Sequence, residues 1–303
     1  MIFIIYNNIL ETIGNTPIVK LTKVQNYYNL NFNLYAKIEY FNPFGSIKDR
    51  ICINMIESLI KEKTINNDTI IIEATSGNTG IGLAHVCNYY NLKLIIIISK
   101  KMSIERINLL QALKAKTILV EDIKEGILLA KKLNKRLENS FYISQFTNIK
   151  NYQTHYTTAK EILRDIPNID YALLGIGSGG TITGISKYLK RVNKNTVIYG
   201  VEPENNPFLT LNKTGNSKIN GIGTTFFPKI LDLTYTDKIL LANEENSFEM
   251  CNKLIILEGL FVGFSSGSLL SVVIKNKELF KKSSNVLLIF PDNGYKYISL
   301  NKF

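Results

Sequence analysis

The chain has 303 residues, 45% of them hydrophobic, and a formal net charge of +11. This length predicts two domains or one large α/β unit. The lysines are scattered over what read as solvated helix faces, so the charge does not indicate a nucleic-acid-binding protein. No stretch approaches the roughly 18 apolar residues that a membrane-spanning helix needs. The three cysteines are far apart and odd in number, which indicates core thiols in a reducing, cytoplasmic compartment.

The first half of the chain alternates short β-branched runs with amphipathic stretches. Strands are expected at 69–74, 94–98, 116–120 and 141–143, and helices at 78–90, 103–114 and 123–137. This repetition predicts a parallel sheet that is covered by helices on both faces.

The same alternation restarts in the second half of the chain. Helices are expected at 152–164, 181–192, 246–258 and 266–280, and strands at 171–174, 197–201 and 286–290. The stretch 204–242 is richer in Asn, Gly, Pro and Thr, and it is expected to be irregular. Two α/β units are therefore predicted.

A first motif, Asn42-Pro-Phe-Gly-Ser-Ile-Lys-Asp-Arg50, joins a Pro-x-Gly turn to an amphipathic helix. Ser46 and Asp49 resemble a capping box, which places Lys48 in the first helical turn. A cation at this end opposes the helix dipole, which favours the neutral amine that Schiff-base chemistry needs. The alternative interpretation is a surface lysine whose stem covers apolar surface.

A second motif, Glu73-Ala-Thr-Ser-Gly-Asn-Thr-Gly80, ends a buried strand and opens a helix. Backbone N–H groups and hydroxyls converge at such a turn, which suits an anion such as a carboxylate. An ordinary strand-to-helix turn with a polar cap is the alternative.

A third motif, Gly175-Ile-Gly-Ser-Gly-Gly-Thr181, again lies between a strand and a helix. It satisfies the pattern G-x-G-x-x-G, and Glu202 ends the next strand, as in a dinucleotide-binding fingerprint. A phosphate at this helix start is expected, and a nicotinamide-dependent dehydrogenase stays open. Against the dehydrogenase, the motif follows a complete α/β unit, and Pro203 comes directly after the acidic residue.

The three motifs in this order resemble the fold-type II pyridoxal-phosphate (PLP) enzymes, and further matches resemble the cysteine synthase family. These matches are Ile13-Gly-Asn-Thr-Pro17, Met102-Ser-Ile-Glu-Arg106, Gln145-Phe146, His155-Tyr-Thr-Thr158, Gly221-Ile-Gly223, Gly263-Phe-Ser-Ser-Gly267 and Pro291-Asp-Asn-Gly294 with Tyr297. The resemblance covers nearly the whole chain. It implies an α/β fold of two doubly wound, three-layer domains with the cofactor between them. Residues 1–147 would carry the PLP lysine and 148–303 the phosphate loop, with about 14–35 packing on the second domain.

The resemblance also implies a role for individual residues. Lys48 would form the Schiff base with PLP and act as the catalytic base, and Ser265 would face the pyridine nitrogen. The cofactor phosphate would be held by Gly177, Ser178, Gly179, Gly180 and Thr181. The substrate α-carboxylate would be held by Thr75, Ser76, Gly77, Asn78 and Thr79, with Gln145 on the substrate side and Asn78 also near the PLP hydroxyl. His85 and His155 are expected to be structural, and no metal site is indicated.

The activity implied is the β-replacement of O-acetyl-L-serine by sulfide, giving L-cysteine and acetate through an α-aminoacrylate. A homodimer is expected, and serine acetyltransferase is a possible partner by the same resemblance. Cystathionine β-synthase, a thiosulfate-using cysteine synthase B and a non-catalytic serine acetyltransferase-binding protein stay open. The chain departs from the family at Ala159-Lys160, where Gly-Pro is usual, at Phe264, where a small aliphatic residue is usual, and before Gly221, where a common His is missing. These departures blur the choice of sulfur donor.

Overall fold

A computed structural model describes residues 5–303 and divides the chain into two compact units. Unit 1 comprises Met1–Thr16 and Tyr40–Gln145, and unit 2 comprises Pro17–Glu39 and Phe146–Phe303. The boundary expected after residue 147 lies close to the change of unit after Gln145. Within residues 5–303, no helix is both long enough and apolar enough to cross a membrane.

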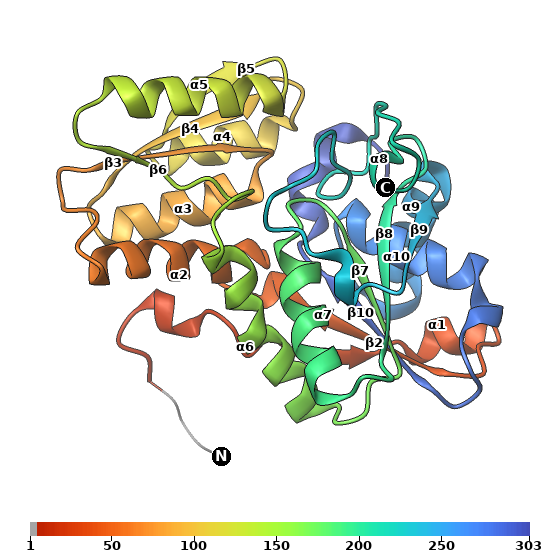
Figure 1. Cartoon of the computed structure of the whole chain (residues 1–303). Helices are drawn as coiled ribbons and strands as arrows, with labels where there is room; N and C mark the ends of the chain where they lie inside the picture. Colours follow the sequence, from red (N-terminus) through yellow and green to blue (C-terminus); the bar gives the residue numbers. More distant parts are fainter. Residues whose placement is uncertain (1–4) are drawn as a thin grey trace. The chain divides into compact units, whose positions relative to one another are not determined.

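Unit 1 is built on a four-stranded parallel sheet with the strand order β5-β4-β3-β6 (Figure 1). Its strands are β3 (Ile70–Thr75), β4 (Lys93–Ser99), β5 (Lys116–Val120) and β6 (Ser140–Tyr142). Its helices are α2 (Lys48–Lys61), α3 (Asn78–Tyr89), α4 (Ile104–Ala112) and α5 (Ile123–Arg136). The β-branched runs form strands because branched side chains pack well on a pleated surface.

Each face of this sheet is covered by helices. Ile71, Ile96 and Ile98 belong to one core cluster with the apolar faces of α2 and α3. Their neighbours Ile72 and Ile97 belong to a second cluster with Ala130 of α5. Successive residues of a strand point to opposite faces, so the apolar residues of β3 and β4 serve both cores.

Unit 2 is built on a six-stranded sheet with the order β1-β2-β10-β7-β8-β9, in which β1 and β2 pair antiparallel and the other neighbouring strands pair parallel. Its strands are β1 (Ile18–Lys20), β2 (Asn33–Ile38), β7 (Tyr171–Gly175), β8 (Val197–Pro203), β9 (Lys238–Ala242) and β10 (Asn285–Phe290). Its helices are α1 (Thr22–Tyr27), α6 (Lys150–Asp165), α7 (Gly180–Val192), α8 (Phe208–Leu211), α9 (Glu244–Glu258) and α10 (Phe264–Lys275). In Figure 1, α7 lies in front of this sheet and α10 lies behind it.

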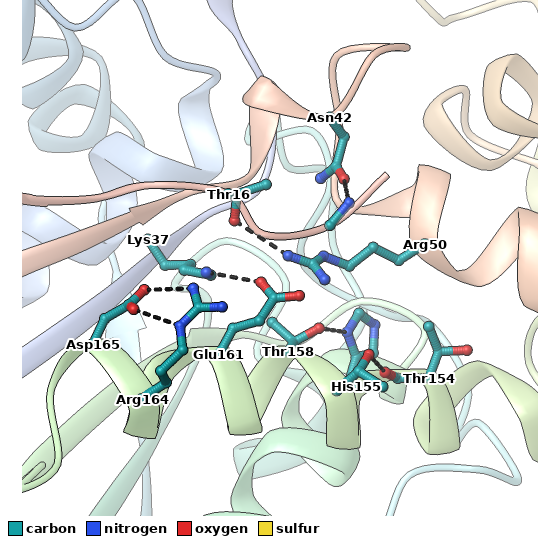
Figure 2. Close-up of polar contacts among 12 residues, drawn as sticks. Thr16, Lys37, Asn42, Arg50, Thr154, His155, Thr158, Glu161, Arg164 and Asp165 are labelled. Atoms are coloured by element: carbon teal, nitrogen blue, oxygen red, sulfur yellow. Dashed lines mark hydrogen bonds and ion pairs between the residues drawn. The ribbon is translucent and has the colours of Figure 1, made fainter. Parts of the chain in front are cut away.

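A buried ion pair ties the early strand β2 to helix α6 within unit 2. Lys37 Nζ lies 2.9 Å from Glu161 Oε2, and the lysine side chain is fully buried (Figure 2). Losing one partner of such a pair would leave an uncompensated buried charge, which costs about 3–5 kcal/mol.

The α/β class predicted from the sequence is confirmed, and the structure corrects three details. The stretch 204–242, expected to be irregular, contains α8 and the edge strand β9. Strands β1 and β2 were not expected. Strand β1 is short, and β2 pairs with this short strand and with β10, which lies far away in the sequence. The helix expected at 266–280 ends earlier, because Asn276 closes α10 by donating from its side chain to the Val272 carbonyl oxygen (2.7 Å).

Candidate active site

Lys48 is the first residue of α2 and is half-buried. The expected capping box takes a different form, because the Asp49 carboxylate accepts from the Phe44 backbone N–H (2.7 Å) and the Ser46 hydroxyl (3.2 Å). The Ser46 oxygen in turn accepts the N–H of Lys48 (3.2 Å). The fully buried Asp49 therefore fixes the turn that precedes the lysine.

The lysine motif is also tied to the segment 13–16 inside unit 1. Asn42 Oδ1 accepts the Gly14 N–H (2.9 Å), and Arg50 donates from Nη2 to Thr16 Oγ1 (3.2 Å; Figure 2). Asn42, Arg50 and Thr16 are all buried. Two of the sequence motifs therefore meet at the start of α2, and they hold the backbone of Lys48 in place.

The second motif forms the connection between β3 and α3. Gly77 lies at the N-cap of α3 with φ +141°, a conformation that an L side chain rarely adopts. Its N–H donates to Thr75 Oγ1 (3.1 Å), so the Thr75 hydroxyl stabilises the turn. Ser76 is exposed and Asn78 is half-buried, which leaves these two side chains at the surface of the turn.

Gln145 lies against this same loop. Its Oε1 accepts the Thr79 hydroxyl (2.8 Å), and its Nε2 donates to the Ala74 carbonyl oxygen (3.1 Å). The structure therefore brings together the five residues 75–79 and Gln145, all within unit 1. It also divides them: Thr75, Thr79 and Gln145 are buried supports, whereas Ser76 and Asn78 are accessible.

Two charged residues beside this loop were given no role from the sequence. The Arg106 side chain is almost fully buried, and a Cβ placed on Gly77 would lie 2.5 Å from Arg106 Cδ. Glu73 is fully buried in β3, and burial raises the pKa of its carboxyl to about 8. The signal that could have found Glu73 is an acidic residue inside an otherwise apolar buried strand.

The third motif forms the connection between β7 and α7 in unit 2. Gly179 is the N-cap of the 13-residue helix α7, with φ +88°. Side chains are excluded here: a Cβ on Gly177 would lie 2.6 Å from the Gly221 carbonyl oxygen, and one on Gly180 would lie 1.9 Å from Asn151 Oδ1. The Ser178 Oγ is buried and has no hydrogen-bond partner among the described residues. A helix N-terminus with such close backbone and an unused hydroxyl is suited to a phosphate.

His155 supports this loop. It is fully buried in α6, and its Nδ1 lies 3.2 Å from Thr158 Oγ1 (Figure 2). Its Nε2 lies 3.3 Å from Thr181 Oγ1. His155 therefore positions the Thr181 hydroxyl of the predicted phosphate loop. His85, in contrast, stacks on Phe44, with 4.0 Å between ring centroids.

Ser265 lies in the first turn of α10, which begins at Phe264 with Gly263 at its N-cap. Ser265 is 2% exposed, and its Oγ has no hydrogen-bond partner among the described residues. A Cβ on Gly221 would lie 3.6 Å from this Oγ, and Gly221 also lies against Gly177. The phosphate loop and the Ser265 hydroxyl thus flank the same Gly221 segment. These groups fit PLP, which carries a phosphate at one side and a ring nitrogen at another.

The dehydrogenase alternative loses its acidic residue in this structure. The Glu202 carboxylate is fully buried, and it accepts the N–H groups of Leu209 and Thr210 (both 2.9 Å) and the Thr210 hydroxyl (2.6 Å). Glu202 therefore binds the start of α8, and its oxygens are occupied by protein donors. This removes the ribose contact on which the dinucleotide fingerprint depends.

Comparisons with known proteins agree with this chemistry. The family model described as "Pyridoxal-phosphate dependent enzyme" matches residues 9–292. The chain is 39% identical over 297 residues to a cysteine synthase of Flavobacterium sp. (strain K3-15), covering 95% of this chain and 96% of the relative. It is 38% identical over 306 residues to cysteine synthase B of Campylobacter jejuni, covering 99% of each.

A solved structure extends the comparison to three dimensions. The O-acetylserine-dependent cystathionine β-synthase of Helicobacter pylori matches with a TM-score of 0.93 and 36% identity, covering 98% of each chain. These relatives share the fold and differ in the reaction that their names describe. The chain belongs to the cysteine synthase family of PLP-dependent enzymes.

Proposed function

We propose that the protein is a cysteine synthase, which converts O-acetyl-L-serine and sulfide into L-cysteine and acetate. The observation that carries the proposal is the loop between β3 and α3. It presents Ser76 and Asn78 at a helix N-terminus, where N–H groups favour an anion such as the α-carboxylate of an amino acid. The relatives named cysteine synthase and cysteine synthase B support cysteine as the product.

In this proposal the chain's own residues bind, orient and move one proton. The loop 75–79, supported by Gln145, would hold the substrate α-carboxylate, the loop 177–181 would hold the cofactor phosphate, and Ser265 would hydrogen-bond the ring nitrogen. PLP, when bound, supplies the electron sink for the α-carbon. The Lys48 amine takes the α-proton as general base, and acetate leaves the β-carbon with the bonding electron pair. Sulfide then forms the C–S bond, and Lys48 returns the proton to the α-carbon.

The choice of a hydroxyl at Ser265 favours this reaction. A neutral hydroxyl would not keep the nitrogen of a bound PLP ring protonated, as a carboxylate would, so the ring would withdraw fewer electrons from the α-carbon. Departure of the β-substituent then precedes transamination.

A donor-competition assay tests the proposal. Purified, PLP-loaded protein is given O-acetylserine with sulfide, thiosulfate or homocysteine, and the products are separated and quantified. Cysteine formation that is fastest with sulfide supports the proposal. Faster use of homocysteine would assign a cystathionine β-synthase, the second candidate, which the Helicobacter pylori structure favours. Faster use of thiosulfate would assign the reaction of a cysteine synthase B, and no turnover with any donor would favour a non-catalytic binding role.

Assembly and location belong to the same proposal. We expect a homodimer that can bind serine acetyltransferase, and light scattering with and without that enzyme measures both. The three cysteines are buried and free, which fits a reducing compartment such as the cytoplasm.

A further inference from the structure

Glu73 is a fully buried carboxyl in β3, next to the loop that the proposed function assigns to the substrate. Its Oε1 lies 3.5 Å from the backbone nitrogen of Gln145. Its Oε2 has no hydrogen-bond partner among the described residues. Burying an acid in this way costs free energy, so the position of Glu73 calls for a compensating role.

The carboxyl lies where strand β6 has ended and the chain turns back towards the loop. The last ladder bond runs from the Ile143 N–H to the Ile72 carbonyl oxygen (3.0 Å). Ser144 then adopts φ +56°, a left-handed conformation that is strained for a residue with a side chain. Backbone N–H groups of both Ser144 and Gln145 are directed at the Glu73 carboxyl. Hydrogen bonds to the Glu73 carboxyl thus stabilise the strained turn at Ser144.

The turn at Ser144 decides where Gln145 points. Beyond it, the Gln145 side chain is held by the Thr79 hydroxyl and the Ala74 carbonyl oxygen. Glu73 therefore interacts with both the backbone and the side chain of Gln145, and the loop also binds that side chain. Both ends of the α-carboxylate loop are connected to Glu73 through this one residue.

We propose that Glu73 is a positioning residue for the amino-acid substrate, which stabilises the left-handed turn at Ser144 and so sets Gln145 against the loop 75–79. The proposal rests on the proposed function, in which this loop holds the substrate α-carboxylate. Glu73 itself touches neither the substrate nor the cofactor in this role.

The protonation state of Glu73 supplies a matched pair of variants. Its pKa is raised to about 8 by burial, so the carboxyl is mostly neutral at pH 7. The titratable groups facing it are Tyr142 on β6 and Cys52 on α2, whose pKa values are both raised, so neither titrates near pH 8. A neutral carboxyl offers one acceptor and one donor, as a glutamine amide does. Glu73→Gln therefore keeps an oxygen that accepts from the backbone N–H groups. Glu73→Met has a side chain of similar length but no such acceptor.

The test measures kcat and KM for O-acetylserine on PLP-loaded wild type, Glu73→Gln, Glu73→Met, Ser144→Gly and the double variant Glu73→Met/Ser144→Gly. Glu73→Met should raise KM roughly tenfold with little change in kcat, because one buried acceptor is lost. Glu73→Gln should keep the wild-type KM below pH 8. Ser144→Gly should restore part of the KM of Glu73→Met, since glycine adopts positive φ without strain.

A pH profile gives a second readout. The KM of the wild type should change as pH rises through 8, because Glu73 loses its proton there. The KM of Glu73→Gln should lack this pH-dependent change. The substrate amine also titrates near pH ~8, and it contributes equally to both profiles. A wild-type KM in Glu73→Met, or no rescue by Ser144→Gly, would overturn the proposal.

Hydrogen exchange separates this inference from the proposed function. Amides of residues 143–145 should exchange faster in Glu73→Met than in wild type, with or without substrate. Unchanged exchange there would contradict the role of Glu73 even in a protein that makes no cysteine. Inactive wild type with faster exchange in Glu73→Met would instead reject the proposed function alone.

Discussion

The side chain of Arg106 lies directly against the Cα of Gly77, so closely that a Cβ on the glycine would be 2.5 Å from Arg106 Cδ and 2.7 Å from Nε. Gly77 also has φ +141°. Two independent constraints, one from the backbone and one from packing, therefore demand glycine at the centre of the proposed substrate loop.

Gly77→Ala should impair substrate binding and leave PLP binding intact. The new methyl group must displace either the loop or a buried guanidinium, so KM for O-acetylserine should rise by more than about tenfold. The phosphate loop belongs to unit 2 and is unchanged, so the visible PLP absorbance should persist. Gly259→Ala is the matched control, because Gly259 has φ +70° and, apart from its chain neighbours, none of the described residues has a heavy atom within 4 Å of an added Cβ. It should lower stability by about 1 kcal/mol and leave KM unchanged. Equal KM effects in both variants would refute the packing argument.

Lys48→Ala should abolish β-replacement and the covalent attachment of PLP. Borohydride reduction of the wild type should fix the cofactor to the peptide that contains Lys48, as mass spectrometry would show. Lys61→Ala, at the exposed end of the same helix, should behave like the wild type. A reducible adduct that survives in Lys48→Ala would place the anchor on another lysine.

Ser265→Ala should act differently on the cofactor-free and PLP-loaded protein. Ser265 does not cap the helix, because α10 begins at Phe264 with Gly263 at its N-cap and makes no side-chain cap hydrogen bond. Without PLP, removing a buried hydroxyl that has no partner among the described residues should leave the melting temperature unchanged or slightly raised. With PLP, the lost hydrogen bond should weaken cofactor affinity roughly fivefold.

A control on the same helix distinguishes this effect from general destabilisation. The Ser271 hydroxyl donates to the Ser268 carbonyl oxygen (2.9 Å), so Ser271→Ala should lower the melting temperature equally in both forms. Ser265→Asp is the sharper variant, since a carboxylate should protonate the ring nitrogen, slow β-elimination and allow transamination. Wild-type turnover in Ser265→Asp would remove Ser265 from the site.

The buried Glu73 should make stability fall with rising pH. Its pKa is about 8 in the folded protein, against an ordinary value of 4.5. The folded state therefore keeps a proton that the unfolded state releases, and the stabilisation present below pH 4.5 is lost as pH rises to 8. The change is on the order of a few kcal/mol. Glu73→Gln should remove this slope, which the difference between the two melting-temperature profiles measures. Parallel profiles would show that Glu73 is already ionised at neutral pH.

The sequence predicted some parts of this fold well because buried parallel strands leave a strong local signal. Strand β5 has the expected bounds, 116–120, and β3 is shifted by one residue. Strand β2 escaped prediction because its partner β10 lies about 250 residues away, so its pairing is a tertiary property. Strand β9 is a short edge strand that follows a Gly- and Asn-rich stretch, and only its pairing with β8 defines it.

The candidate site, like the fold, was predictable only where the local sequence carries the signal. The motifs indicated which loops matter, because glycines and hydroxyls at strand ends are visible in a linear sequence. The roles of Thr79 and Ser76 could not be separated, since that depends on which side chain turns inward. The contact between Gly77 and Arg106 joins the β3–α3 connection to helix α4, and no local pattern in the sequence indicates it. The residue roles themselves stay predictions that the variants above can test.

The position of β2 has a consequence for how the protein is made. β2 leaves the ribosome early, yet it joins the sheet of unit 2 through β10, near the end of the chain. At about 5–20 residues per second, the apolar side chains of Leu34, Ala36 and Ile38 wait on the order of tens of seconds for this partner. The strands of unit 1, in contrast, all lie between residues 70 and 142 and can pair while synthesis continues. Until β10 is made, the nascent chain therefore carries β2 with one edge lacking its final partner, while the strands of unit 1 can already pair.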